Sequence, residues 1–405
     1  MDEPILASSR EIIPVGLLYS SRGPYAAIGR AAIDGALMAL AEVNEDDGFP
    51  FTLKAAIRDP EGVSERYPTQ AEDLARLGCR HLIGTITSSS RKDVIPVVER
   101  AGALLWYAFP YEGYETSDHV VYLGACPNQH IVPLLDHALP RFGDRPFLVG
   151  SNYIWGWEIN RIAREIVAAH GAEPVGERYL AVGSTDVDHL IAAVREKRPD
   201  FVLSNLIGPS SYAFVKAYAA LGAEDPAFAP SVRPILSCNL TEADTDEIGA
   251  PGAGLLSTAI YFDSLDLTEN EAFQARARAR FGEGRRFSSC FVSVYAAIRM
   301  LAEAIRDAGT DDPAAIKAVA TGRAFSTPFG RLAIDAKTSH AAHRPHLGRV
   351  RADGSIEIIE SGAAVIPADP YLVRTRLPAD PVHPADPAPV RREANAAAAR
   401  LRVIT

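Results

Sequence analysis

The segment HLIGTITSSSRKDVIPVVERAGALLWYA, residues 81–108, contains one complete strand–helix–strand unit. His81–Ile86 and Leu104–Ala108 are short runs of aliphatic, β-branched and aromatic residues, which is typical of buried strands. Between them, Arg91–Ala101 has apolar residues at helical spacing. A strand, a helix and a second strand in this order indicate two parallel strands of one sheet, joined by a crossover helix.

The same alternation extends along the chain in both directions. Further strands are expected at Val15–Tyr19, Phe51–Ile57, Val120–Gly124, Phe147–Gly150, Phe201–Asn205, Ile235–Cys238 and Leu255–Tyr261. Further helices are expected at Gly29–Val43, Gln70–Arg76, Ile131–Leu139, Glu158–His170, Val187–Lys197, Tyr212–Leu221 and Phe291–Ala308, with Asp186 as the N-cap of the helix that starts at Val187. These elements form about four strand–helix pairs before residue 122 and about four between residues 147 and 254, so we expect two similar α/β lobes.

The last third of the chain has a different pattern. Residues 270–320 are largely helical, and 325–359 are expected to form short strands with turns at 328–330 and 352–354. These pieces are too small for a third core, so we expect them to complete the two lobes across a hinge of several strands. The expected division is 1–125 with about 258–325 for the N-terminal lobe, and 126–257 with about 326–368 for the C-terminal lobe. Residues 369–405 form a proline-rich tail, either wrapped on the surface or binding a partner.

Composition and charge exclude several classes of protein. The 41 Lys and Arg residues against 51 Asp and Glu residues give a net charge of −10, which argues against binding nucleic acid directly. The sequence contains no run of 18 apolar residues, so no membrane span is expected. The N-terminus lacks a basic region followed by an apolar stretch, which favours a cytoplasmic protein, or a periplasmic one if a leader was missed. The four cysteines form no CxxC motif and are expected to be reduced.

Catalytic and cofactor motifs are weak or absent. The sequence has no GxSxG, and the S-x-x-K pattern at 89–92 lacks the companion motifs of an enzyme, so we expect a helix start capped by Ser88 or Ser89. His340, His343 and His346 fall in a strand-and-turn region and are expected to be hydrogen-bonded loop residues rather than zinc ligands. Neither phosphate-binding glycine motif occurs, so no nucleotide cofactor is expected.

Polar and aromatic residues cluster where the expected strands end, which is where open α/β sheets bind ligands. They are Ser20, Ser21, Thr87, Ser88, Ser89, Tyr107, Phe109, Pro110, Tyr153, Trp155, Asn205, Asn239, Tyr261 and Phe262. Hydroxyls, amides and rings dominate, and no charge pair for an amino acid is apparent, so the expected ligand is small, neutral and polar. Ser88 and the N–H groups of its helix start would hold the ligand carbonyl, and Tyr107, Tyr153 and Trp155 would enclose it. Alternatively, these aromatic rings simply fill the cleft between the lobes.

The segment RKDVIPVVERAGALLWYAFPYEGYETSDHVVYLGACPNQH, residues 91–130, resembles the amide- and urea-binding branch of the type I periplasmic-binding-protein family. The most specific parts are Pro110–Gly113 and Pro127–Gln129. Further similarity lies in GLLYSSRG near residue 16, GSNYIWGWEIN at 150–160 and AIYFDS at 259–264, so the resemblance extends from about residue 15 to about 370.

This resemblance implies two lobes that close on a small amide without catalysis. By position, Ser88, Tyr107, Pro110 and Tyr153 match residues of the family's amide pocket, and Asn239 falls near another. Ile86 and Phe109 replace a tyrosine and a threonine of the family's cytoplasmic amide sensors, which favours a larger aliphatic or aromatic amide, or a nitrile-derived one.

The resemblance leaves two roles open for this binding protein. Family members are either cytoplasmic sensors, which negatively regulate amidase genes by sequestering an RNA-binding antiterminator, or receptors of ABC transporters for short-chain amides or urea. The missing leader favours the sensor, and the acidic charge would suit a basic partner. An oligomer is possible.

Overall fold

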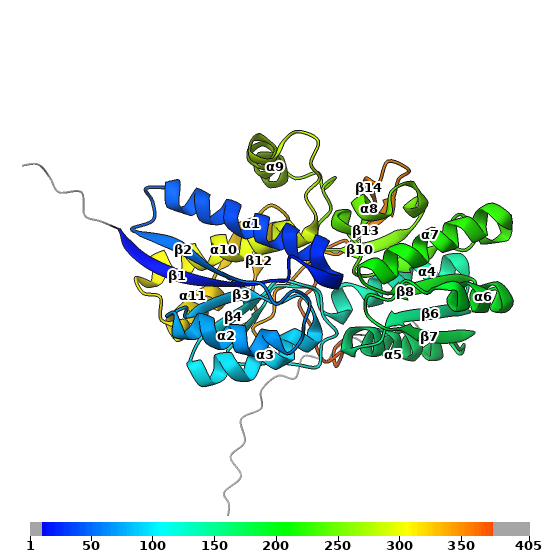
Figure 1. The fold of residues 1–405 in the computed structure, drawn as a ribbon, viewed down its shortest axis with the longest axis horizontal. Coiled ribbons are helices and arrows are strands. Elements are labelled where there is room, and N and C mark those ends of the chain that lie inside the picture. The colour runs from blue at the N-terminus through cyan, green and yellow to red at the C-terminus, as the bar shows by residue number, and fades with distance from the viewer. Residues whose placement is uncertain (1–9, 376–405) are drawn as a thin grey trace, which may run out of the picture.

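The computed structural model describes residues 10–375 and folds them into two α/β lobes that lie side by side (Figure 1). The N-terminal lobe contains a five-stranded sheet of β1 (Glu11–Leu18), β2 (Phe51–Arg58), β3 (His81–Gly84), β4 (Leu104–Tyr107) and β5 (Val120–Tyr122). The strands are parallel and lie in the order β2-β1-β3-β4-β5. All their carboxyl ends therefore face the same edge of the sheet.

Helices from two distant parts of the chain cover this sheet. They are α1 (Ala26–Glu45), α2 (Arg66–Arg76), α3 (Ser88–Ala101), α10 (Ser289–Ala308) and α11 (Pro313–Gly322). The helices α1 and α10 pack closely because Gly35 of α1 has no side chain: a Cβ there would lie 2.2 Å from the carbonyl oxygen of Phe291. The hairpin of β11 (Ala324–Thr327) and β12 (Gly330–Ala333) packs on the same core through Phe325 and Leu332.

The C-terminal lobe contains a seven-stranded mixed sheet in the order β14-β13-β10-β9-β8-β6-β7. Its strands are β6 (Pro146–Ser151), β7 (Gly176–Leu180), β8 (Phe201–Asn205), β9 (Ile235–Ser237), β10 (Leu256–Ala259), β13 (His346–Val350) and β14 (Ile356–Ser361). Its helices are α4 (Ile131–Phe142), α5 (Ile154–Ala169), α6 (Asp188–Lys197), α7 (Pro209–Glu224) and α8 (Glu242–Ile248), while α9 (Thr268–Phe281) follows the return to the first lobe. Separate apolar clusters pack on the two faces of this sheet.

Backbone hydrogen bonds join the segments that cross between the lobes. The N–H of Tyr122 donates to the carbonyl of Ser339 (2.8 Å), and the N–H of Ala341 donates back to Tyr122 (2.9 Å). The side-chain amide of Gln129 donates to the carbonyls of Ala341 (3.0 Å) and Ile366 (2.9 Å). The expected two-lobed α/β fold with a hinge of several segments is therefore confirmed.

Several local expectations were wrong. Strand β7 was not predicted, because GERYL is polar and lies at a sheet edge. Helix α3 is capped by Thr87, whose side chain accepts the N–H of Ser90, rather than by Ser88 or Ser89. Helix α6 starts one residue later, and Asp186 is not its N-cap.

The division into lobes remains a proposal. Because β11 and β12 both pack on the first core, we place the end of the second N-terminal segment near residue 334 rather than 325. Residues 376–405, most of the predicted proline-rich tail, lie outside the described part of the chain. Among residues 10–375, no helix combines the length and apolar composition that crossing a bilayer requires.

Candidate ligand-binding site

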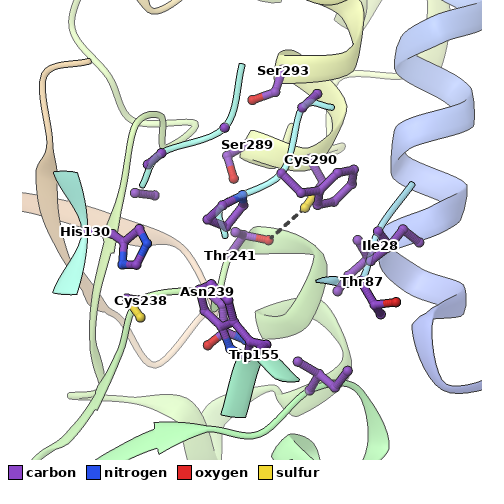
Figure 2. Close-up of a pocket in the computed structure, with 18 of the residues that line it drawn as sticks. Ile28, Thr87, His130, Trp155, Cys238, Asn239, Thr241, Ser289, Cys290 and Ser293 are labelled. Atoms are coloured by element: carbon purple, nitrogen blue, oxygen red, sulfur yellow. Dashed lines mark hydrogen bonds between the residues drawn. The ribbon is translucent and has the colours of Figure 1, made fainter. Parts of the chain in front are cut away.

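A cavity lies between the lobes, where strands of both sheets end (Figure 2). Its empty space, including the part open to solvent, is about 820 Å³. The N-terminal lobe and α10 contribute Tyr25, Ile28, Ile86, Thr87, Ser88, Ala108, Phe109, Pro110, Gly124, Ala125, Ser289, Cys290 and Ser293. The hinge and the C-terminal lobe contribute His130, Tyr153, Trp155, Ile207, Cys238, Asn239, Thr241, Thr258, Ala259 and Ile260.

The cavity wall is apolar and carries no formal charge. None of the described residues that line it is Asp, Glu, Lys or Arg. The one histidine, His130, accepts the N–H of Ile131 at Nδ1 (2.7 Å) and donates from Nε2 to the carbonyl of Tyr111 (3.0 Å). Burial lowers the pKa of His130 to about 4, so the ring is neutral at ordinary pH.

Ser88 lies on the cavity wall in the first turn of α3, and its hydroxyl proton is already engaged. The Ser88 Oγ–H donates to the carboxylate of Glu112, which is 2% exposed. Arg91, fully buried, donates to Glu112 (2.8 Å) and to Glu115 (2.7 Å). A hydroxyl has one proton and two lone pairs, so Ser88 offers only lone pairs to a ligand. This differs from the expectation that Ser88 would hold a ligand carbonyl.

Trp155 carries a hydrogen-bond donor, whereas Ser88 offers an acceptor. Trp155 lines the cavity from α5, and its indole Nε1–H is buried with no hydrogen-bond partner within residues 10–375. The ring packs at a tilt against His130, with 5.6 Å between the ring centres. Indole can only donate, and a buried donor without a partner is rare in a native protein. A ligand acceptor would satisfy this group.

Eight of the fifteen candidate residues named from the sequence line the cavity. They are Ile86, Thr87, Ser88, Phe109, Pro110, Tyr153, Trp155 and Asn239. Trp155 reaches it because α5 starts at Ile154, earlier than the sequence pattern predicted. The side chain of Asn239 is held by the hydroxyl of Ser237 (3.0 Å) and the carbonyl of Leu206 (3.3 Å).

The other seven do not line the cavity: Ser20, Ser21, Ser89, Tyr107, Asn205, Tyr261 and Phe262. The Tyr107 hydroxyl donates to the carbonyl of Ile86 (2.9 Å), Asn205 donates to Asn160 (2.8 Å), and Tyr261 donates to Asn270 (3.0 Å). Neighbouring residues of an extended chain point to opposite sides. Ala108 and Ile260, which adjoin Tyr107 and Tyr261, line the cavity in their place.

Sequence reasoning also missed residues that do not stand at strand ends. Tyr25 and Ile28 come from the start of α1, and Ser289, Cys290 and Ser293 come from the start of α10. These five residues reach the cavity only because α1 and α10 pack together beside the cleft between the lobes. The single available pattern was a pair of serines four residues apart in the apolar first turns of this helix.

The remaining motifs have structural partners. His343 contacts the carbonyl of Leu123 (2.8 Å), His346 contacts the hydroxyl of Ser361 (2.8 Å), and His340 stacks on Tyr122. In the described part of the chain, no three His, Cys, Asp or Glu side chains are grouped as a metal ion requires. Lys92 of the S-x-x-K pattern pairs with Glu115 (2.8 Å).

Solved structures share this fold. A solute-binding protein of an ABC transporter from Rhodopseudomonas palustris HaA2, in complex with p-hydroxybenzoic acid, superimposes with a TM-score of 0.79 and 23% identity, covering 90% of this chain and 100% of that one. The branched-chain amino acid transporter substrate-binding protein LivJ from Streptococcus pneumoniae, in complex with isoleucine, gives a TM-score of 0.77 with 16% identity, covering 88% and 100%. At such identities, the likeness concerns the fold alone.

The sequence comparisons agree with the fold. The Leu/Ile/Val-binding protein homolog 6 of Brucella abortus (strain 2308) is 24% identical over 361 residues, which cover 85% of this chain and 89% of the relative. The family model described as periplasmic binding protein domain matches residues 13–377 of the 405. The protein therefore belongs to the type I periplasmic-binding-protein family.

Proposed function

We propose that the protein is a solute-binding protein of the ABC-transporter type and that its ligand is a small, uncharged primary amide with an apolar substituent. The observation that carries this proposal is that Ser88 and Trp155, one from each lobe, line the same uncharged cavity. Ser88 can only accept a hydrogen bond and the Trp155 indole can only donate one. A primary amide has the matching groups, because its carbonyl accepts and its NH₂ donates.

Other ligand classes fit this wall less well. A carboxylate has acceptors only, so it would face the lone pairs of Ser88 with no proton between them. An amino acid would bury two charges without a charged partner on the wall, which is costly. Urea has no apolar body to contact Ile28, Ile86, Phe109 and Ile260.

The transport role is favoured over the regulatory one by the two solved structures of the same fold, which are titled as binding proteins of transporters. A role as a negative regulator that sequesters an RNA-binding antiterminator rests only on the resemblance of residues 91–130. A transport receptor acts in the periplasm, so we propose that location in place of the cytoplasmic one. Fractionation of cells that express the full natural gene, probed with an antibody, tests it: recovery with cytoplasmic markers contradicts the receptor role.

Isothermal titration calorimetry with amides and with other small ligands tests whether the ligand is an amide. We expect binding of benzamide and butyramide, and at least tenfold weaker binding of benzoate, leucine and urea. A ligand at 100 times its Kd stabilises the fold by about 2.7 kcal/mol, so thermal unfolding gives an independent readout. Tighter binding of benzoate than of benzamide would overturn the amide assignment.

A further inference from the structure

The first turns of α10 present two serine hydroxyls to the cavity. Ser289 and Ser293 are 8% and 4% exposed, and both line the cavity. They are four residues apart, so they lie on the same face of the helix. Neither hydroxyl has a hydrogen-bond partner among residues 10–375, whereas the adjacent Ser288 caps the helix by accepting the N–H of Phe291 (3.4 Å).

This absence of partners is informative because a helical serine has an easy alternative. Its hydroxyl commonly bonds the carbonyl one turn earlier in its own helix. Ser293 makes no such bond here, although the carbonyl of Ser289 is available in sequence. The close contact of α10 with α1 at Gly35 fixes the position of the helix that carries both serines. Two serines of low exposure therefore form a polar patch that residues 10–375 leave without a hydrogen-bond partner.

The patch lies apart from Trp155, one of the two groups that we assign to the amide. In Figure 2, Ser289 and Ser293 lie toward one end of the drawn residues, and Trp155 lies toward the other. Apolar side chains, among them Ile28, Ile86 and Phe109, line the same cavity. The cavity thus offers hydrogen-bonding groups in two places, together with apolar side chains.

We infer that Ser289 and Ser293 form a distal subsite that selects amides with a hydroxyl group on the far end of the apolar body. This deepens the proposed function, on which it rests, by naming a subclass of ligand. A ligand hydroxyl both donates and accepts, which matches a pair of serine hydroxyls. Replacing this hydroxyl by hydrogen leaves both serines without a ligand partner, and such a loss discriminates more strongly than a lost apolar contact.

The test compares 3- and 4-hydroxybenzamide with benzamide by isothermal titration calorimetry on the full chain. We expect at least one hydroxylated isomer to bind the parent about tenfold more tightly than benzamide. In the S289A/S293A variant, this ratio should fall to about one while the Kd of benzamide stays within about threefold. The matched control is Ser204→Ala, which removes a buried, unpartnered serine hydroxyl of β8 that does not line the cavity. This control should keep the tenfold ratio.

A second ligand pair separates the two proposals. Benzoate and its 3- and 4-hydroxy derivatives carry the same ring without the amide. If only these acids bind, the amide assignment is wrong, and their hydroxyl ratio in the parent and in S289A/S293A decides the subsite. The subsite is wrong if no hydroxylated ring binds the unmodified protein more tightly than the same ring without the hydroxyl. It is also wrong if S289A/S293A keeps the preference for the hydroxylated ring. If no member of either ligand series binds, both proposals are wrong.

Discussion

Replacing Trp155 by Phe removes a buried donor of a cavity-lining residue that has no hydrogen-bond partner among residues 10–375. A hydrogen bond to a neutral acceptor contributes about 0.5–1.5 kcal/mol, so the Kd for benzamide should rise by roughly 2- to 12-fold. The empty protein should change little in stability. Loss of about 40 Å³ of ring costs about 1 kcal/mol, and removal of a buried, unpaired donor offsets about 1–3 kcal/mol.

Calorimetry and urea unfolding measure these two effects separately. Trp157→Phe is the matched control, because Trp157 is 45% exposed and its indole already donates to Asn152 (2.9 Å). It should leave the Kd unchanged. Equal benzamide affinity of the Trp155→Phe variant and the parent would refute a role for the indole donor. A loss of more than about 3 kcal/mol in the unfolding free energy would show instead that the indole is bonded in the empty state.

Three further predictions follow from buried contacts. Ser88→Ala removes the acceptor for the ligand NH₂ and leaves a Glu112 oxygen without its donor, so benzamide should bind about 2- to 12-fold more weakly and the unfolding free energy should fall by about 1–3 kcal/mol in urea titrations. Unchanged binding would exclude Ser88 from the site. Burial raises the pKa of Glu242 to about 8 from an ordinary 4.5, so its contribution to stability is present below pH 4.5 and is lost as the pH rises through 8. Glu242→Gln should therefore stabilise the protein at pH 8.5 by about 1 kcal/mol or more relative to its effect at pH 5, and an equal effect at both pH values in urea titrations would contradict this. Gly35→Ala forces a Cβ to within 2.2 Å of a carbonyl oxygen of α10 and should cost about 1–3 kcal/mol of unfolding free energy, whereas a neutral result would mean that α1 and α10 separate freely.

The fold was largely predictable because its information is local. Hydrophobic periodicity indicates the alternation of strands and helices. The segment at 81–108 forms β3, α3 and β4, with only small differences from the predicted ends. The edge strand β7 was missed because an edge strand is half exposed and lacks a continuous apolar run. The N-cap of α3 was misplaced by one residue because Thr87, Ser88 and Ser89 are all good capping residues.

The candidate site was predictable only in part. Ligands of parallel sheets bind at strand ends, so the sequence pointed to Ser88, Phe109 and Trp155. The same rule also selected Tyr107 and Tyr261, whose side chains point to the other side of the chain. A single-residue error in where a strand ends reverses the direction of a side chain, and hydrophobic patterns do not fix strand ends that closely.

By itself, the sequence determined the fold class, the two lobes and the edge of the sheets at which the cavity lies, because these depend on periodicity within about 30 residues. Tertiary structure decided the chemistry of the cavity. The proton of Ser88 is committed to Glu112, 24 residues away, and Ser289 reaches the cavity only because α10 returns to pack on α1. Which hydrogen-bonding groups remain free for a ligand depends on contacts between distant segments. Local sequence patterns carry no information about those contacts.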